Sequence, residues 1–374
     1  MLRATFIFIL ILTLSGCKSR VGNTESRRSS NHFARGFEIE KQGDVTKLTV
    51  YNPWEKARNI SVEYYLINRN NPVPDSLQTK NIVRTPVKRI VCMSTSHLGF
   101  VDVLNENNSV VGISGSLYVS DPEIRQRVEN GEAVDVGYGQ NLNYELIVSQ
   151  HPDIVMVYGI GSEVAEYSKK LEELGIPVIM NAEYLEESPL GKAEWLKFMA
   201  TFFEKETEAA QFFEKIEKEY SALQKLTENK QNRPKVLVGS PYKDAWWVPG
   251  GNSYMAHLIA DAGGDYLGKS NPSHESYVIS FENALTWGNE ADVWINMGYL
   301  ASKNEILAAD IRFKSFRVFN DGRLYNNNKR QNEHGANDFW ESGTVRPDWV
   351  LRDLISVFYP GLISEETVYY QEVK

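Results

Sequence analysis

The sequence is poor in cysteine and lacks several compact motifs that mark enzymes. Only Cys17 and Cys92 occur among 374 residues, so no Cys-x-x-Cys pair is available to hold a metal ion. The Gly-x-Ser-x-Gly turn of hydrolases and the His-Glu-x-x-His motif of zinc proteases are also missing. The six histidines are widely spaced along the chain. These patterns do not favour catalysis.

The composition excludes several broad classes of protein. Hydrophobic residues make up 42% of the chain and charged residues 24%, so neither a disordered chain nor a multi-span membrane protein fits. The net charge of -9 repels phosphate backbones, and nucleic acid is therefore not expected as a partner. The length leaves room for two domains of ordinary size and a small third one.

Residues 1–17 have the pattern of an export signal. An apolar run that is too short to span a bilayer ends in Leu-Ser-Gly-Cys at Cys17. This ending resembles the lipobox of bacterial lipoproteins, in which cleavage leaves the cysteine as a diacylated N-terminus. We therefore expect an exported protein, anchored to the cell envelope by lipid on Cys17 and facing the periplasm. Cys92 is then the one cysteine beside the anchor, and its apolar neighbours indicate a buried, inert thiol.

The rest of the chain changes character along its length. Residues 18–32 have almost no apolar side chains and predict a flexible tether. Residues 33–84 contain short alternating runs that predict a small antiparallel β-rich unit. Residues 85–190 and 231–374 contain unbroken apolar runs of four or five residues, which are typical of parallel strands covered on both faces. Two α/β lobes are therefore expected after the β-rich unit.

Residues 191–230, between the two lobes, predict the longest helix. From Lys192 to Asn229 this stretch contains neither glycine nor proline, and its aromatic residues recur at helical spacing. The aromatic stripe is interpreted as packing against the lobes. A helix of this length would extend on the order of 55 Å and could join the lobes as a stiff strut.

One sequence pattern occurs in both lobes. Asn143–Met156 and Ser280–Ile295 each contain a polar residue, an aromatic residue, Glu, a short helical stretch and an Asp that opens an apolar strand. With these segments the chain resembles the substrate-binding proteins of ABC importers for iron-siderophores and cobalamin. Further matches in order and spacing are Pro86–Ser94, Asp135–Gly139 and Ala262–Leu267. The resemblance covers residues 85–358, and the β-rich unit before it departs from the family pattern.

The resemblance implies an α/β fold with two Rossmann-like lobes joined by a single long helix, here preceded by the small β-rich unit. Such proteins clasp a bulky metal chelate between the lobes and deliver it to the permease of an ABC importer. The expected ligand is a ferric siderophore, haem or cobalamin. Neither enzymatic activity nor a resident metal or cofactor is implied.

Candidate ligand-binding residues follow the ends of the expected strands, because open α/β sheets place ligands there. Aromatic residues recur at these turns, and their wide faces suit a chelate or macrocycle, although each could instead pack beneath its own loop. The candidates are Ser94, His97, Tyr118, Tyr138, Tyr158, Tyr184, Tyr242, Trp246, Trp247, Tyr299, Trp340 and Arg346. A binding role is favoured most for the three tryptophans. Neighbouring Trp246 and Trp247 point in different directions on a strand, so one of them is expected in the core.

Basic side chains are scarce near the same turns. Lys243, Arg312 and Arg346 are the cations expected there. A strongly anionic catecholate chelate would favour a cluster of arginines, because guanidinium groups pair with its negative charges. The scarcity of such groups favours a less charged ligand, such as cobalamin, haem or a hydroxamate.

The resemblance also implies that one surface Glu on each lobe pairs with arginines of the permease. Glu163 and Glu305 begin corresponding helical segments and are the candidates, with Glu166 as an alternative to Glu163. Acidic residues at helix starts are equally explained by the helix dipole.

Two other functions stay open at this point. A bare zinc or manganese receptor of related architecture would place several histidines in the cleft, and His97 is positioned for such a role without an evident partner. An exported hydrolase would use a pair of carboxylates, for which Glu145 and Glu282 are candidates. Their equivalent positions in the repeated segment favour a structural role at helix starts.

Overall fold

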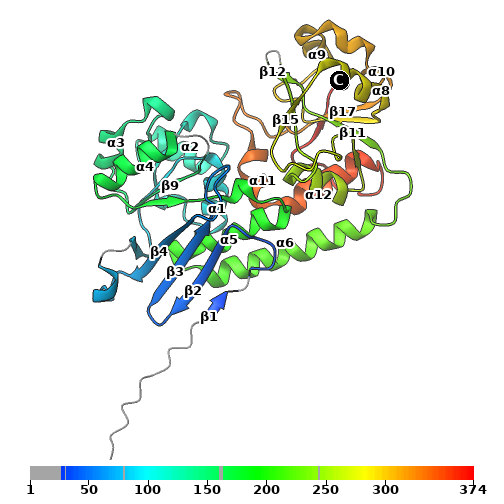
Figure 1. The fold of residues 1–374 in the computed structure, drawn as a ribbon. Helices are drawn as coiled ribbons and strands as arrows, with labels where there is room; N and C mark the ends of the chain where they lie inside the picture. Colours follow the sequence, from blue (N-terminus) through cyan, green and yellow to red (C-terminus); the bar gives the residue numbers. More distant parts are fainter. Residues whose placement is uncertain (1–26, 30, 79–80, 160–162, 243–244) are drawn as a thin grey trace, which may run out of the picture.

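The computed structural model describes residues 27–374 except 30, 79–80, 160–162 and 243–244 (Figure 1). The export signal, the lipid attachment at Cys17 and most of the tether therefore lie outside the described residues. Within the described part of the chain, no helix is both long and apolar enough to cross a membrane.

The first lobe contains a parallel sheet of five strands in the order β10-β9-β6-β7-β8. Its strands are β6 (Ile90–Cys92), β7 (Val110–Ile113), β8 (Val134–Asp135), β9 (Ile154–Val157) and β10 (Val178–Met180). Its helices are α1 (Thr95–Val103), α2 (Pro122–Glu129), α3 (Tyr144–Ser149) and α4 (Glu163–Glu173). The three central strands are fully buried, as their unbroken apolar runs predict. Cys92 is a buried free thiol in this sheet, as expected, and burial raises its pKa.

The second lobe also contains a sheet of five strands, in the different order β14-β11-β16-β17-β18, so its first strand in sequence lies next to the edge rather than at the centre. Its strands are β11 (Lys235–Val238), β14 (Asp265–Tyr266), β16 (Val293–Ile295), β17 (Arg323–Asn326) and the antiparallel β18 (Gln371–Glu372). A small antiparallel sheet is formed by β12 (Pro241–Tyr242), β13 (Ala245–Val248) and β15 (Tyr277–Ile279). The helices are α7 (Tyr254–Asp261), α8 (Phe281–Glu290), α9 (Lys303–Ala309), α10 (Arg317–Asp321), α11 (Ser342–Val345) and α12 (Pro347–Phe358). The two-lobe α/β fold expected from the sequence is confirmed.

The N-terminal unit is a sheet of five strands in sequence order. Its strands are β1 (Arg27–Ser29), β2 (Phe37–Gln42), β3 (Val45–Tyr51), β4 (Ser61–Asn68) and β5 (Ile82–Thr85). Two expectations are corrected here. Strand β5 pairs parallel to β4, so the sheet is mixed rather than antiparallel. Residues 27–29, expected within the tether, form a strand because they pair with residues 39–41 of β2.

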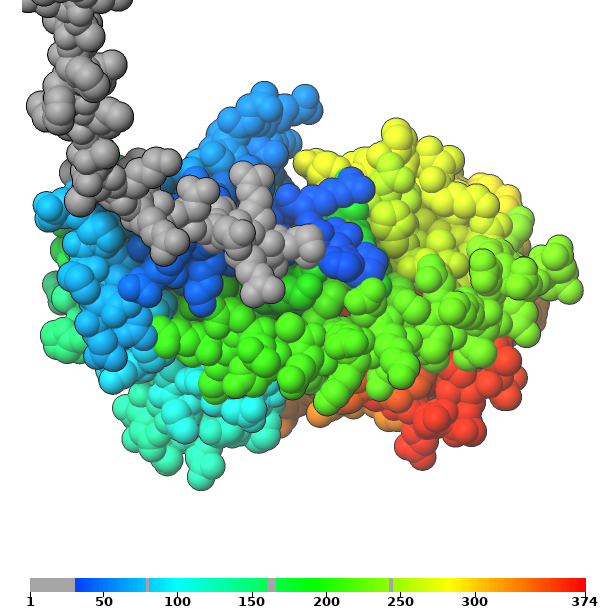
Figure 2. All heavy atoms as spheres, turned by 90° about the horizontal axis from the view of Figure 1, so that it is seen from below, coloured from blue at the N-terminus to red at the C-terminus, as the bar shows by residue number. Residues whose placement is uncertain are grey.

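The stretch expected as one helix over 191–230 is divided into two. Helix α5 (Pro189–Phe203) ends at Glu204, whose backbone is left-handed with φ 58°, and α6 (Glu206–Thr227) begins two residues later. The ammonium group of Lys197 lies 4.6 Å from the ring centre of Phe213, so α6 folds back along α5. Helix α6 then runs beneath both lobes (Figures 1 and 2). Its first turns pack into the first-lobe core and its later turns into the second-lobe core, so it is the strut between them.

Two buried carboxylates attach the N-terminal sheet to this junction. Glu194 of α5 accepts backbone hydrogen bonds from residues 32–34 at 2.8 to 3.1 Å, and Glu186 accepts from residues 35 and 36. The same Glu186 accepts a bond of 3.0 Å from the indole of Trp195, which packs against Phe37 of β2. The sheet is therefore built into the body of the molecule where the two lobes meet.

A second connection between the lobes follows β17. The 3-10 turn η7 (Asp338–Trp340) and helix α11 lead the chain from the second lobe back onto α1 of the first lobe. The side chain of Val345 enters the first-lobe core, and a Cβ atom on Gly99 would collide with the backbone carbonyl of Glu341. This close approach requires glycine at position 99.

Candidate functional site

A cleft between the lobes has two adjoining compartments. The first, called here the aromatic compartment, has a volume of about 420 Å³ and is lined mainly by Tyr118, Trp247, Met255, Asn296, Tyr299 and Trp340. The second, called the acidic compartment, has a volume of about 490 Å³ and is lined mainly by Glu55, Tyr158, Glu183, Tyr184, Lys192 and Glu275. Thr95, Pro249, Met255, Ser276 and Trp340 line both, so the compartments form one cleft.

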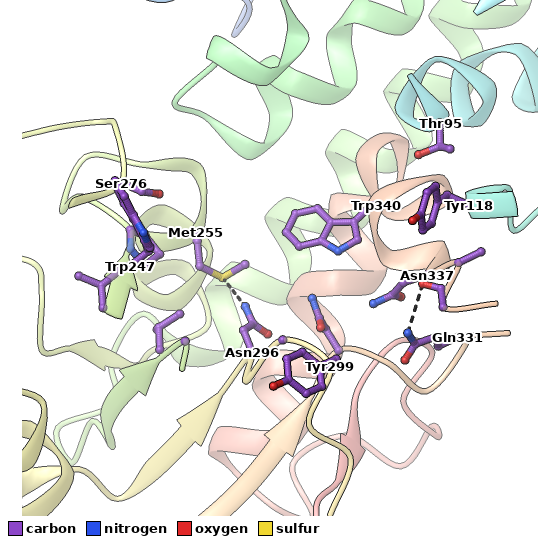
Figure 3. Close-up of a pocket in the computed structure, with 18 residues that line it drawn as sticks. Thr95, Tyr118, Trp247, Met255, Ser276, Asn296, Tyr299, Gln331, Asn337 and Trp340 are labelled. Atoms are coloured by element: carbon purple, nitrogen blue, oxygen red, sulfur yellow. Dashed lines mark hydrogen bonds between the residues drawn. The ribbon is translucent and has the colours of Figure 1, made fainter. Parts of the chain in front are cut away.

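Trp340 stands at the boundary of the compartments. It ends η7, whose first turn is fixed by the side chain of Asn337 accepting a hydrogen bond from the Phe339 backbone at 3.1 Å. The indole meets the Phe339 ring edge to face at 4.8 Å and is still 56% exposed. In Figure 3 the indole projects into the space between Trp247 and Met255 of the second lobe and Tyr118 and Thr95 of the first. The contact with Phe339 and the capped turn orient the indole, and its exposed face is open to the cleft.

Strand ends position the other lining residues, as expected for open α/β sheets. Ser94 and Thr95 follow β6, Tyr118 follows β7, and Asn296 follows β16. Ser94 also caps α1 by accepting a hydrogen bond from the backbone of Ser96 at 3.3 Å. Both sheets therefore present the ends of their strands to the same cleft.

The structure brings seven of the twelve candidate ligand-binding residues to this cleft. Ser94, Tyr158 and Tyr184 line the acidic compartment, Tyr118, Trp247 and Tyr299 line the aromatic one, and Trp340 lines both. The remaining five are His97, Tyr138, Tyr242, Trp246 and Arg346. Strand β12 contains Tyr242, whose side chain lies outside the described residues, as does the whole of Lys243.

Trp246 is the buried member of its pair and does not line the cleft. It is 3% exposed, stacks on Phe316 and donates a hydrogen bond from its indole to the Val238 carbonyl at 3.2 Å. Trp247, the next residue on β13, is 52% exposed in the cleft. The alternation of a strand thus separates a core tryptophan from a cleft tryptophan, as expected for such a pair.

Arg346 and Arg312 also lie away from the cleft, because each is held by acidic neighbours. Arg346 forms two hydrogen bonds with Asp348 and stacks on Trp349 with its guanidinium 3.6 Å from the ring centre. Arg312 is bound by Asp310. Both were expected near the turns that follow the strands, and neither lines a compartment of the cleft.

His97 lies beneath the floor of the acidic compartment. It is fully buried, and neither ring nitrogen has a hydrogen-bond partner. Burial lowers its pKa to about 3, so the ring is neutral at physiological pH. Its ring meets Tyr158 edge to face at 6.4 Å, which places it behind the lining rather than in it. Among the described residues, no group of three or more His, Cys, Asp or Glu side chains is placed to hold a metal ion.

Tyr138 follows β8 and is 67% exposed. It lines neither compartment, although its hydroxyl interacts with that of the lining residue Tyr158. Burial is the largest influence on the Tyr158 hydroxyl and raises its pKa, as it does for Tyr184. Both lining phenols are therefore neutral hydrogen-bonding groups.

The two hydrolase candidates are exposed acids in the first turns of short helices. Glu145 lies in α3, capped by Asn143, and Glu282 lies in α8, capped by Ser280. Local hydrogen bonds, chiefly with its own backbone and with Ser280, lower the pKa of Glu282. Neither residue lines a compartment of the cleft.

Of the permease-docking candidates, Glu305 is exposed in the first turn of α9. It accepts a hydrogen bond from the backbone of Ala301 at 2.7 Å, while its own backbone donates to Ser302 at 3.2 Å. This pattern differs from a capping box, because the Glu305 side chain accepts from Ala301, the residue before the N-cap Ser302. Glu163 begins α4, and its side chain lies outside the described residues.

Residues 263–270 match the spacing of a phosphate loop, Gly-x-x-x-x-Gly-Lys-Ser. A phosphate loop joins the end of a strand to the start of a helix. Here the segment follows helix α7 and contains the short strand β14, and the ammonium group of Lys269 is paired with Asp265. The match therefore lacks the structural context that a phosphate site needs.

Several lining residues have no strong signal in the sequence. Met255 enters the cleft from α7, and the segment between β17 and η7 contributes Asn327, Gln331 and Asn337. Glu183 and Lys192 lie on the floor of the acidic compartment, from η5 (Glu183–Leu185) and α5. In Asn337–Trp340 a polar residue is followed by a turn and an aromatic residue. This is the one local pattern that could have indicated a binding role for the segment.

Comparisons with known proteins match this geometry. The profile of a family described as periplasmic binding protein matches residues 90–317. Two uncharacterized lipoproteins of Methanocaldococcus jannaschii are similar to the chain. One is 29% identical over 80% of this chain and 72% of its own length. The other is 26% identical over 98% of this chain and 97% of its own, so that similarity includes the N-terminal sheet.

A solved structure is similar in fold. The periplasmic heme binding protein of Pseudomonas aeruginosa superposes with a TM-score of 0.59 at 17% identity, covering 77% of this chain and 98% of that one. At this identity the likeness establishes the arrangement of the lobes and carries no statement about the ligand.

Proposed function

Because the chain belongs to the periplasmic binding protein family, we propose that it captures a bulky metal chelate in the cleft between its lobes. A ferric siderophore, haem or cobalamin is the expected class of ligand. The observation that carries the proposal is a cleft lined by both lobes with four large aromatic residues on its walls, Tyr118, Trp247, Tyr299 and Trp340. All four are more than half exposed. Such side chains are available to be covered by a flat ligand.

Capture requires no covalent step. The two compartments together offer a volume suited to a molecule larger than a single amino acid or sugar. The aromatic faces supply buried area, and the amides of Asn296, Gln331 and Asn337 supply directional hydrogen bonds. Affinity then comes from the apolar area buried on binding and from the match in shape and hydrogen bonding between ligand and cleft. We propose no reaction at this site.

We further propose that lipid on Cys17 holds the protein at the cell envelope and that the loaded protein delivers its ligand to an ABC permease. Two similar proteins bear the name lipoprotein, which supports the anchor. Glu163 and Glu305 are the proposed docking residues, one on each lobe. Glu163→Gln together with Glu305→Gln should abolish ligand uptake by cells without changing ligand affinity. Unchanged uptake would remove these residues from the docking surface.

The capture proposal is tested by calorimetric titration of the full-length chain in detergent. The panel consists of cyanocobalamin, haem, ferric trihydroxamates and a ferric tricatecholate. Saturable one-to-one binding of at least one compound is expected. Trp340→Ala should weaken that binding by roughly tenfold or more, since a central exposed aromatic is a typical hot spot. Trp349→Phe, outside the cleft, is the matched control. Absence of binding across the panel would contradict the proposal.

A further inference from the structure

The two compartments of the cleft differ sharply in charge. Among the described residues that line the aromatic compartment, none has an ionisable acid or base other than tyrosine. Its polar groups are hydroxyls and amides, including Ser276, Asn327 and Gln331. This compartment therefore suits a ligand surface that is uncharged and packs against aromatic side chains.

The acidic compartment contains five carboxylates and few cations. The carboxylates are Glu55, Glu183, Glu186, Glu187 and Glu275, and the basic groups among the described lining residues are Lys192 and His274. Glu186 is already occupied by backbone N–H groups of the N-terminal segment. The other four come from the N-terminal sheet, the first lobe and the second lobe. Acidic character is thus contributed by every part of the molecule that surrounds this compartment.

Glu183 is the innermost of these carboxylates. It is 2% exposed, and its Oε1 accepts a hydrogen bond from the Ser96 hydroxyl at 2.7 Å. Its Oε2 has no hydrogen-bond partner. A buried carboxylate oxygen without a partner is costly, and a donor brought by a ligand would remove that cost.

Lys192 does not satisfy this oxygen with a hydrogen bond. Its ammonium group lies 5.1 Å from the ring centre of Tyr254. Burial is the largest influence on both residues, lowering the pKa of Lys192 and raising that of Glu183, whereas their mutual attraction acts in the opposite direction. Burial therefore opposes the charge on both Glu183 and Lys192, and the Oε2 atom of Glu183 is left without a hydrogen-bond donor.

We infer that the ligand combines an uncharged body that packs against aromatic side chains with a positively charged, hydrogen-bond-donating arm. The body occupies the aromatic compartment against Trp247 and Trp340. The arm enters the acidic compartment and donates to Glu183. The inference rests on the proposed function, whose ligand class it narrows, and it assigns the acidic compartment as the site that selects ligands by charge.

The same arrangement rejects polyanionic chelates. A ferric tricatecholate would bring its negative charges close to Glu55, Glu187 and Glu275. No described arginine lines either compartment to offset that repulsion. Like charges held together in a partly desolvated cleft oppose binding and supply specificity.

The test uses two ferric chelates that differ by one charge. Ferrioxamine B has a neutral ferric trihydroxamate body and a free alkylammonium arm, and its N-acetylated derivative keeps the body and loses the charge. Calorimetric titration of the full-length chain at low salt should give affinity on the order of tenfold or more in favour of the charged form, as expected for one charge-assisted hydrogen bond. Ferric tricatecholate should bind more weakly than either.

Variants of the chain locate the effect. Glu183→Gln should reduce the preference for the charged form, and Glu275→Gln on the compartment wall should reduce it in part without disturbing the buried floor. Glu145→Gln, an exposed acid outside the cleft, should leave it unchanged. Equal affinity for the two ferrioxamines, or tightest binding of the tricatecholate, would overturn the inference while the receptor function stands. Failure of every compound in the full panel to bind would instead overturn the receptor function.

Discussion

At the scale of single residues, Glu341 joins the two lobes. It lies in the segment that returns from the second lobe, is 3% exposed, and accepts hydrogen bonds of 2.8 Å from the backbone N–H groups of Ser120 and Asp121 in the first lobe. Burial is the largest influence on its carboxyl group and raises its pKa to about 8, although the two N–H bonds act in the opposite direction. Its protonation state therefore couples pH to the contact between the lobes.

This coupling predicts how stability depends on pH. Because the folded pKa lies above the unfolded value, the stabilising contribution of Glu341 is fully present below the unfolded pKa and is lost as pH rises through about 8. Its contribution to the free energy of unfolding should fall by roughly 1.4 kcal/mol per pH unit between these limits. Urea unfolding of the protein and of Glu341→Gln from pH 6 to 9 measures the difference. Parallel pH profiles for the two proteins would contradict this account.

The positions of individual site residues show which features of the site could be predicted from the sequence. Strand alternation indicates that Trp246 and Trp247 face opposite sides, but which side meets the cleft depends on how β13 pairs with β15. Arg346 follows an expected turn, yet Asp348 and Trp349 hold it elsewhere. Glu183 and Lys192 give no signal because their importance arises from burial, which is a property of the packed lobes.

At the scale of elements, the loop between β3 and β4 of the N-terminal sheet forms part of the cleft wall. Trp54 in this loop pairs with Gly159 of the first lobe, and the neighbouring Glu55 lines the acidic compartment. A Cβ atom on Gly159 would lie 2.5 Å from the Trp54 Cβ and 2.8 Å from the Pro53 carbonyl. The contact therefore requires glycine, and the N-terminal sheet extends the site beyond the two lobes.

Gly159→Ala should displace this loop. Both contacts are far closer than van der Waals packing allows, and one involves backbone that cannot rotate away. Hydrogen exchange of residues 52–60 should become faster, while exchange in the first-lobe sheet stays unchanged. Gly343→Ala, where the nearest atom is 3.6 Å from the added carbon, serves as the control. Unaltered exchange in residues 52–60 would show that the loop is not held by this contact.

The break between α5 and α6 could not be predicted from the sequence pattern. Glu204 adopts a left-handed conformation that usually signals glycine or asparagine, so the continuous helical pattern gives no sign of it. The turn is supported by tertiary contacts instead. The Glu204 carboxylate accepts hydrogen bonds from Asn68 and Thr85 of the N-terminal sheet at 2.7 and 2.8 Å. A feature fixed by partners far away in the sequence cannot be predicted from local spacing.

At the scale of the whole molecule, two connections restrict relative motion of the lobes. Helix α6 packs into both cores, and the segment from η7 to α11 returns to the first lobe. The repeated segment of the sequence predicts two similar lobes, and residues 191–230 predict the helical strut between them. It does not predict the second connection, because this depends on where residues 338–346 fold back.

Small-angle X-ray scattering tests this restriction. With both connections in place, the radius of gyration should be the same, within error, with and without saturating ligand, because the lobes cannot rotate far about α6. A decrease on ligand binding, of the kind seen when hinged domains close, would contradict the rigid arrangement.

The most direct test of the central claim is a crystal structure of the chain with the tightest-binding chelate of the panel. We expect the chelate to lie between Trp247 and Trp340 and to contact both lobes, with any cationic arm directed towards Glu183. A chelate bound to one lobe alone, or on a surface outside the two compartments, would contradict it.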